Sequence, residues 1–363
     1  MNIGVITESQ SDEFRVALTP DAAKALIAKG FSVQVQSGAG ATASFDDAAY
    51  TAIGCTIGAS AKDVLGAADI VCKVQAPNAD EVSMMKANSA IFCAMNAWKN
   101  EDIVAALKAK GIKAFALERI PRISRAQSMD ILSSMATVAG YKAVLLAAAQ
   151  SGKFFPMFVT AAGTIPPTKC FIIGAGVAGL QAISSARRIG AVVEAFDVRP
   201  AVKEQVESLG AKFVEIDLGE KDTETSGGYA KELSEEAKKR QQEGMAKHIE
   251  MSDVVITTAA IPGKPAPKII TDDMIARMKR GSIIVDLAAE TGGNTNQTVA
   301  GQNTVTANGV TIIAPVNLAA TMPIHASQMY AKNLVNLLML LVKKEGISVH
   351  LDDEILSACC VTV

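Results

Sequence analysis

The stretch KCFIIGAGVAGLQAISSARRIGAVVEAFD, residues 169–197, decides the fold. An apolar strand runs into glycines at positions 174, 176 and 179, a helix follows, and a second apolar strand ends at Asp197. This order is the fingerprint of a dinucleotide-binding β-α-β unit. The first glycine allows a tight turn, the second lets the backbone approach a pyrophosphate, and the third lets helix and strand pack closely. The pyrophosphate would then lie at the helix N-terminus, where free N–H groups and the helix dipole attract it.

Asp197, 18 residues after Gly179, indicates which dinucleotide the unit takes. Its carboxylate would accept hydrogen bonds from the adenosine ribose hydroxyls and would repel a 2′-phosphate, which favours NAD over NADP. Arg199 could serve a 2′-phosphate instead, so NADP stays open as the alternative. A second glycine pattern, GAGATA at residues 38–43, also follows a predicted strand. No clear helix and strand ending in a carboxylate come after it, so we expect the first pattern to bind the nucleotide.

The composition excludes several classes of protein. Hydrophobic residues make up 49% of the chain, and 35 basic residues nearly balance 37 acidic ones, which argues against a disordered chain and against a nucleic-acid binder. The apolar run at residues 334–342 is too short to cross a bilayer, and the N-terminus carries no secretory signal. The six cysteines have no metal-type spacing, so we expect reduced thiols in a cytoplasmic setting and no metal site.

Short Val- and Ile-rich runs alternate with longer Ala- and Leu-rich amphipathic stretches, which is the pattern of parallel β-α-β units. We predict an α/β protein of two doubly wound, Rossmann-like domains with a cleft between them. The N-terminal domain comprises residues 1–138 together with 320–363, and the NAD-binding domain comprises residues 139–319. Strands of the first domain are predicted at residues 3–6, 32–36, 70–73, 90–93 and 113–116.

Several predicted helices and one loop complete the outline. Thr19 and Pro20 predict the start of a helix over residues 20–29. A long helix over residues 129–149 precedes the second domain, and a helix over residues 326–343 is expected to fold back against the first. Residues 217–228 are predicted to form an exposed loop and residues 231–247 a charged surface helix.

A polar cluster, RISRAQSMD at residues 122–130, immediately precedes the long helix. One interpretation is a helix capped by Ser128 or Asp130 and flanked by solvated arginines. The other is a binding site, because the cluster lies at the junction of two domains, where clefts form. The residues alone leave both interpretations open.

Several motifs carry a family resemblance: RISRAQSMD, GAGVAGLQAI from residue 174, TTAAIPGKPAP from residue 257 and VDLAAETGGN from residue 285. Together they resemble the NAD(H)-binding component, the first alpha subunit or domain I, of proton-translocating NAD(P) transhydrogenase. The likeness covers essentially the whole chain. It implies a Re/Si-specific transhydrogenase component that passes hydride between NAD(H) on this chain and NADP(H) on a partner.

The same resemblance implies the roles of individual residues. Arg122, Gln127 and Asp130 would contact the nicotinamide and its ribose, with Ser133 as a neighbour. Tyr229 matches a mobile loop that closes over the bound nucleotide. The implied cofactor-binding residues are Gly174, Gly176, Val177, Ala178, Gly179, Asp197, Val198, Arg199, Gly228 and Tyr229.

The resemblance further implies partners and a location. The partners would be an NADP(H)-binding domain and a membrane-spanning proton-channel subunit, which would hold this cytoplasmic chain peripherally on the inner membrane. The chain would be a separate first alpha subunit or an excised domain, and it would form a homodimer. Residues 154–167, FFPMFVTAAGTIPP, look like a hairpin that crosses between subunits, with an ordinary buried turn as the alternative.

The chain also resembles alanine dehydrogenase in its predicted fold, so alanine dehydrogenase activity is the alternative function. Arg15 and Lys73 match its substrate contacts, but Asn96 stands in the segment that should hold its catalytic histidine, and Glu290 replaces its aspartate. Such an enzyme must move a proton as well as a hydride, whereas hydride exchange between two nicotinamide rings needs no acid or base. The missing histidine therefore favours the transhydrogenase component. A catalytically idle NAD-binding module is a third possibility.

Overall fold

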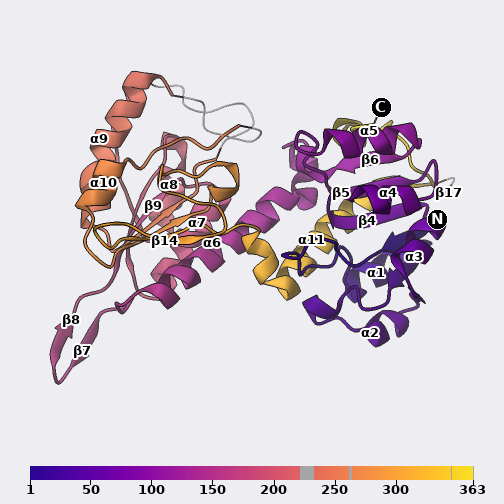
Figure 1. The fold of residues 1–363 in the computed structure, drawn as a ribbon, viewed down its shortest axis with the longest axis horizontal. Coiled ribbons are helices and arrows are strands. Elements are labelled where there is room, and N and C mark those ends of the chain that lie inside the picture. The colour runs from indigo at the N-terminus through magenta and orange to yellow at the C-terminus, as the bar shows by residue number, and fades with distance from the viewer. Residues whose placement is uncertain (221–232, 261–263, 345, 363) are drawn as a thin grey trace. The chain divides into compact units, whose positions relative to one another are not determined.

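The computed structural model describes residues 1–220, 233–260, 264–344 and 346–362. Within them the chain forms two compact units, one built from residues 1–135 and from residue 319 onward, the other from residues 136–318. Each unit has a mainly parallel sheet between layers of helices (Figure 1). This architecture confirms the predicted α/β, doubly wound fold class.

The sheet of the first unit has six parallel strands in the order β3-β2-β1-β4-β5-β6. Their bounds are Asn2–Val5 (β1), Ser32–Gln36 (β2), Thr56–Gly58 (β3), Ile70–Gln75 (β4), Ala90–Ala94 (β5) and Lys113–Ala116 (β6). The sequence predicts all of them but β3. The three residues of β3 are too few to show a periodic pattern in the sequence.

Side-chain caps mark where the first four helices of this unit begin. The Thr19 hydroxyl accepts a hydrogen bond from the Ala22 N–H and Pro20 is the first helical residue, which confirms the predicted start of α1. The helix ends before the predicted Lys29, and Gly30 turns the chain with φ +91°. The helices are Pro20–Ile27 (α1), Asp47–Thr51 (α2), Ala61–Ala67 (α3), Ala79–Met84 (α4) and Glu101–Ala109 (α5).

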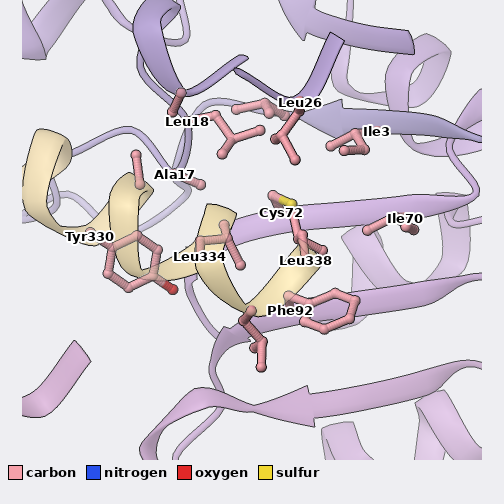
Figure 2. Close-up of a cluster of buried hydrophobic side chains, with 14 of the residues drawn as sticks. Ile3, Ala17, Leu18, Leu26, Ile70, Cys72, Phe92, Tyr330, Leu334 and Leu338 are labelled. Atoms are coloured by element: carbon pink, nitrogen blue, oxygen red, sulfur yellow. The ribbon is translucent and has the colours of Figure 1, made fainter. Parts of the chain in front are cut away.

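The C-terminal part of the chain returns to the first unit, as predicted. Helix α11 (Pro323–Leu338) lays Tyr330, Leu334 and Leu338 against buried residues of the sheet and of α1 (Figure 2). The predicted helix over residues 326–343 is too long at its end, because the last turn tightens into a 3-10 helix, η7 (Met339–Leu341), before a short strand. These side chains complete one of the two hydrophobic layers of the sheet.

The chain end closes an edge of the same sheet. After the ribbon formed by β16 (Val342–Lys343) and β17 (Gly346–Ile347) comes α12 (Glu354–Cys359). The Val361 N–H then donates to the Ala114 carbonyl at 2.8 Å, beside β6. The last residues therefore cover backbone groups that an edge strand would leave unpaired.

The second unit has a seven-stranded sheet in the order β11-β10-β9-β12-β13-β15-β14. All neighbouring strands are parallel except β14, which pairs antiparallel at the edge. The bounds are Lys169–Ile173 (β9), Val192–Phe196 (β10), Lys212–Phe213 (β11), Val254–Thr257 (β12), Ile283–Asp286 (β13), Asn303–Val305 (β14) and Thr311–Ile313 (β15). Alternate residues of β9 face opposite hydrophobic clusters, so both faces of the sheet are covered.

The charged surface helix predicted at residues 231–247 lies slightly later in the chain. Ser234 caps it, and the loop before it lies partly outside the described residues. The helices of the second unit are α6 (Ile131–Gln150, which begins in the first unit), α7 (Val177–Arg188), α8 (Lys203–Ser208), α9 (Glu235–Met251) and α10 (Asp272–Arg277). Among the described helices, α6 alone has the length and apolar composition of a membrane span, features that buried helices of water-soluble proteins share.

The apolar connector at residues 154–167 contains an antiparallel hairpin, β7 (Phe158–Thr160) and β8 (Gly163–Ile165), which projects from its unit (Figure 1). The six residues of its strands are all exposed, and Met157 and Val159 expose 61% and 76% of their surface. The alternative of an ordinary buried turn is therefore wrong. Exposed apolar side chains grouped in this way are typical of surfaces that bind another protein.

Helices α6 and α7 approach each other closely at Gly140. A Cβ atom at this position would lie 2.1 Å from the Ala178 carbonyl oxygen, a backbone atom that cannot swing away. Only glycine therefore lets the long helix pack directly on the first turn of α7.

We expect Gly140→Ala to destabilise the protein by about 1–3 kcal/mol, because the added methyl group forces the two helices apart. Gly66→Ala is the matched control: Gly66 is also helical, and its Cβ would have 3.9 Å of clearance. That substitution should stabilise by roughly 0.5–1 kcal/mol through helix propensity and the less flexible unfolded chain. Thermal or denaturant unfolding of both variants checks the pair, and equal effects would contradict the packing argument.

Candidate dinucleotide-binding site

Each glycine of the fingerprint has the environment that its predicted role requires. Gly174 turns the chain after β9 with φ +93°, a conformation that favours glycine. A Cβ on Gly179 would lie 1.8 Å from the Gly174 carbonyl oxygen, so helix α7 touches the turn that precedes it. A Cβ on Gly176 would meet no atom within 4 Å. The open space at Gly176 is where a pyrophosphate can approach the backbone.

The N-terminus of α7 adjoins this open space. Gly176 is its N-cap and makes no side-chain capping bond, while Val177 and Ala178 form the first turn with partly exposed surfaces. The first N–H groups of a helix lack intrahelical partners and carry its positive dipole end. An anion at this position can therefore be held by backbone alone.

The second glycine pattern, at residues 38–43, differs at the corresponding place. Its middle glycine, Gly40, is closed off, because a Cβ there would lie 2.6 Å from the Phe45 carbonyl oxygen and 2.9 Å from the Tyr50 ring. A short helix, α2, and β3 follow it, but β3 ends at Gly58, so no strand ending in a carboxylate comes after this pattern, as predicted. The chain itself occupies the space that a phosphate would need.

Asp197 lies directly after β10 and is 8% exposed. One carboxylate oxygen accepts a hydrogen bond from the Ala175 N–H at 2.7 Å, which ties the carboxylate to the glycine turn. The Arg199 guanidinium donates to both oxygens at 2.9 Å, and the Arg199 backbone N–H donates at 2.8 Å. The two side chains thus form a two-pronged ion pair, so Arg199 is engaged by Asp197. Val198, between them, is half-buried.

The polar cluster at residues 122–130 belongs to the first unit. Residues Ser124–Met129 form a 3-10 helix, η3, on which Gln127 is exposed, and Arg122 is exposed just before it. Asp130 caps α6: its carboxylate accepts hydrogen bonds from the Ser133 N–H at 3.0 Å and from the Ser133 hydroxyl at 2.6 Å. Of the two predicted capping residues, Asp130 is the one used.

The structure thus groups the predicted site residues in two sets. Asp130 and Ser133 are in contact, and Arg122 and Gln127 lie on the same short segment of the first unit. The glycine turn, Asp197 and Arg199 are joined by hydrogen bonds in the second unit. Gly228 and Tyr229 lie outside the described residues. The predicted cleft between the domains stays a prediction.

Arg15 and Lys73, the residues that match the substrate contacts of alanine dehydrogenase, are held by carboxylates of the first unit. Arg15 pairs with Glu13 at 2.6 Å, as expected of a local partner. Lys73 is fully buried between Glu8 and Glu81, at 3.3 and 3.1 Å. Burial alone would lower the pKa of Lys73, but the two carboxylates outweigh it and raise the pKa.

Asn96, where the dehydrogenase would place its histidine, follows β5 in a left-handed conformation with φ 45°. Asparagine tolerates this conformation better than most residues. The carboxylate of Glu118 accepts hydrogen bonds from the N–H groups of Met95 and Ala97 on either side. Burial raises the pKa of Glu118. Glu118 could not be singled out from the sequence. Nothing in the residues around it indicates that its carboxylate reaches the backbone of Met95 and Ala97, more than twenty positions earlier in the chain.

Two further titratable side chains are exposed. His325 is exposed in the first turn of α11. Glu290 accepts a hydrogen bond from the Asn317 N–H at 2.6 Å. Among the described residues, no group of three or more His, Cys, Asp or Glu side chains could hold a metal ion.

Two family models match nearly the whole chain. The N-terminal domain of alanine dehydrogenase/PNT matches residues 4–139, and the C-terminal domain of alanine dehydrogenase/PNT matches residues 143–363. The chain belongs to the alanine dehydrogenase/PNT family. The family resemblance predicted from the motifs is therefore confirmed.

Members of this family differ in how similar they are to the chain. An NAD(P) transhydrogenase alpha subunit of Rhodospirillum rubrum is 47% identical over 370 aligned positions, covering 100% of this chain and 96% of that protein. Alanine dehydrogenase of Mycobacterium tuberculosis is 30% identical over 301 positions, covering 81% and 74%. The crystal structure of transhydrogenase from Sinorhizobium meliloti superposes with a TM-score of 0.91 at 42% identity, covering 99% of this chain and 98% of that one.

We expect Gly176→Ala to leave the melting temperature unchanged and to weaken dinucleotide binding on the order of tenfold or more, because the methyl group occupies only the open space at the turn. Gly179→Ala should instead destabilise the fold, since its methyl group would overlap the Gly174 carbonyl. Calorimetric titration and thermal unfolding separate the two effects. Unchanged affinity in folded Gly176→Ala protein would place the pyrophosphate elsewhere.

Proposed function

We propose that this chain is the NAD(H)-binding component of a proton-translocating transhydrogenase and passes hydride between NAD(H) and NADP(H) held by a partner. The observation that carries the proposal is Asn96. The resemblance to alanine dehydrogenase implies that a dehydrogenase would need an acid or base in the segment where this chain has Asn96, an asparagine in a left-handed conformation. The 47% identity to a transhydrogenase alpha subunit over the whole chain supports the same choice.

Bound NAD(H) would supply the chemistry, in which a hydride with its electron pair leaves the C4 carbon of one nicotinamide ring and joins the C4 carbon of the other, with no proton released. The protein then has to position the ring, face it correctly and exclude water. Exposed polar side chains such as Arg122 and Gln127 can bind a carboxamide and ribose without reacting. Asp130 can share this role while it caps α6.

The second unit supports NAD(H), and not NADP(H), as the nucleotide on this chain. The Asp197 carboxylate is fixed beside the glycine turn, where it would repel a 2′-phosphate and accept from ribose hydroxyls. Arg199, the residue that could attract a 2′-phosphate, is paired with Asp197. NADP(H) would accordingly be supplied by a partner.

We assign the remaining partners on the same basis. A membrane-spanning subunit would conduct protons and hold this chain on the cytoplasmic face of the inner membrane. A second copy of the chain would cover the exposed apolar hairpin β7–β8, since an apolar surface of this kind is typical of a protein interface. The family resemblance also assigns Tyr229 and Gly228, which lie outside the described residues, to nucleotide binding.

We expect Gln127→Ala to slow hydride transfer about a hundredfold while NADH affinity changes about threefold or less, because Gln127 orients the ring and the ADP half supplies most of the binding. Stopped-flow transfer to an NADP+ analogue on the partner domain and NADH titration measure the two quantities. Gln127 is exposed, so the fold should be unaffected. Asp130→Ala is the contrasting variant, since it also removes the cap of α6. Equal losses of rate and affinity in Gln127→Ala would contradict a positioning role.

Alanine dehydrogenase activity is the second candidate, favoured by Arg15 and Lys73 and by the 30% identity to alanine dehydrogenases. We expect the purified chain not to oxidise NADH with pyruvate and ammonium, because the Asn96 side chain cannot deliver a proton. Absorbance at the NADH band follows the reaction directly, and measurable turnover would replace the proposed function. An idle binding module would bind NADH yet give no transfer to the partner domain.

A further inference from the structure

The segment that carries Arg122, Gln127 and Asp130 is a poor scaffold by itself. It is a single 3-10 helix, η3, preceded by irregular backbone and joined to α6 through Asp130, and 3-10 geometry gives weaker hydrogen bonds than an α-helix. A segment that must hold a nicotinamide ring to within a fraction of an ångström needs outside support. The contacts that supply this support come from the C-terminal end of the chain.

The first contact is an ion pair between Arg125 and the start of α12. The two terminal nitrogens of Arg125 donate to both oxygens of Asp353, at 2.8 and 3.0 Å, and one of them also donates to Glu354 at 3.0 Å. This planar fork fixes direction as well as distance. Asp353 also accepts from the Ile355 N–H at 2.9 Å as the N-cap of α12, so its carboxylate cannot turn away without uncapping the helix.

The second contact is made by helix α11. The side-chain amides of Asn333 and Asn336 both donate to the Ser128 carbonyl oxygen, at 2.8 and 3.0 Å. Ser128 lies between Gln127 and the capping residue Asp130. Two amide donors one helical turn apart therefore hydrogen-bond to the backbone close to the point where η3 ends and α6 begins.

Both supports are themselves anchored. Helix α11 is built into the core of the first unit through Tyr330 and Leu334, which are almost fully buried (Figure 2). Helix α12 buries Ile355 and Leu356 and continues into the strand-like tail beside β6. The 3-10 helix η3 is thus bonded at two points to rigid parts of the fold, while the side chains of Arg122 and Gln127 are exposed.

We propose that Arg125, Asn333, Asn336 and Asp353 are positioning residues: the C-terminal segment of the chain braces η3, and thereby sets the geometry in which Arg122 and Gln127 orient the nicotinamide. The inference rests on the proposed function for the last step only. The brace itself is a property of the protein without ligand and can be measured without NADH.

The test uses Arg125→Met, which keeps the aliphatic stem and removes the donors. Lys343→Met is the matched control, because Lys343 makes a similar exposed ion pair, with Asp352 at 2.7 Å, in the same C-terminal segment. Asn336→Asp is a second, isosteric variant that replaces the amide donor facing Ser128 by an acceptor. Amide hydrogen exchange of residues 124–130 is measured on the full chain alone, and hydride transfer and NADH affinity are measured with the partner domain.

We expect Arg125→Met and Asn336→Asp to speed amide exchange in residues 124–130 and to slow hydride transfer about tenfold or more, with NADH affinity within about threefold. Lys343→Met should change neither. The proposed brace would be wrong if amide exchange in residues 124–130 were unchanged in both Arg125→Met and Asn336→Asp. It would also be wrong if Lys343→Met slowed hydride transfer as much as they do. If Gln127→Ala leaves transfer unchanged, the positioning role of Gln127 fails, and if the unaltered chain gives no transfer to the partner domain, the proposed function fails. In either case the exchange rates alone decide whether the brace exists.

Discussion

The second unit depends on one steric constraint, the direct contact between backbone atoms around the glycine turn. Helix α7 can begin beside β9 only because Gly179 brings no side chain against the Gly174 carbonyl, and α6 can lie on α7 only because Gly140 brings none against Ala178. These contacts aim the free N–H groups of α7 at open space. The Asp197 carboxylate then binds the turn itself, so the predicted pyrophosphate site and ribose site share one rigid frame.

Polar side chains in the first unit are used in two different ways. Lys73, Glu8 and Glu81 are buried together, and such a group is stable only while each charge keeps its partners. Burial raises the pKa of Glu8 even with Lys73 close by, which shows how strongly this interior disfavours isolated charge. Arg122 and Gln127 instead have exposed side chains. The buried group maintains the fold, and the exposed residues are those predicted to contact the nucleotide.

The features that could be predicted from the sequence are those whose signals are local. The strands, the capped start of α1, the turn at Gly174 and the close contact of Gly179 with that turn depend on residues within a few positions of one another. The ties from Arg125 to Asp353 and from Ser128 to Asn333 could not be predicted, because the partners are more than 200 residues apart and neither member is unusual in its own surroundings. The ion pair between Arg199 and Asp197 could not be predicted for another reason. Two residues that are two positions apart can form an ion pair, but their spacing does not require one.

The first unit is discontinuous, since residues 136–318 are inserted between its two parts. During synthesis the ribosome therefore exports the whole of the inserted unit before it exports α11 and the tail beside β6. The sheet of the N-terminal part must wait while residues 136–318 are synthesised, with one hydrophobic face lacking Tyr330, Leu334 and Leu338. In nascent chains the second unit should accordingly fold before the first unit is complete. The incomplete sheet of the first unit is the part that a chaperone would have to shield.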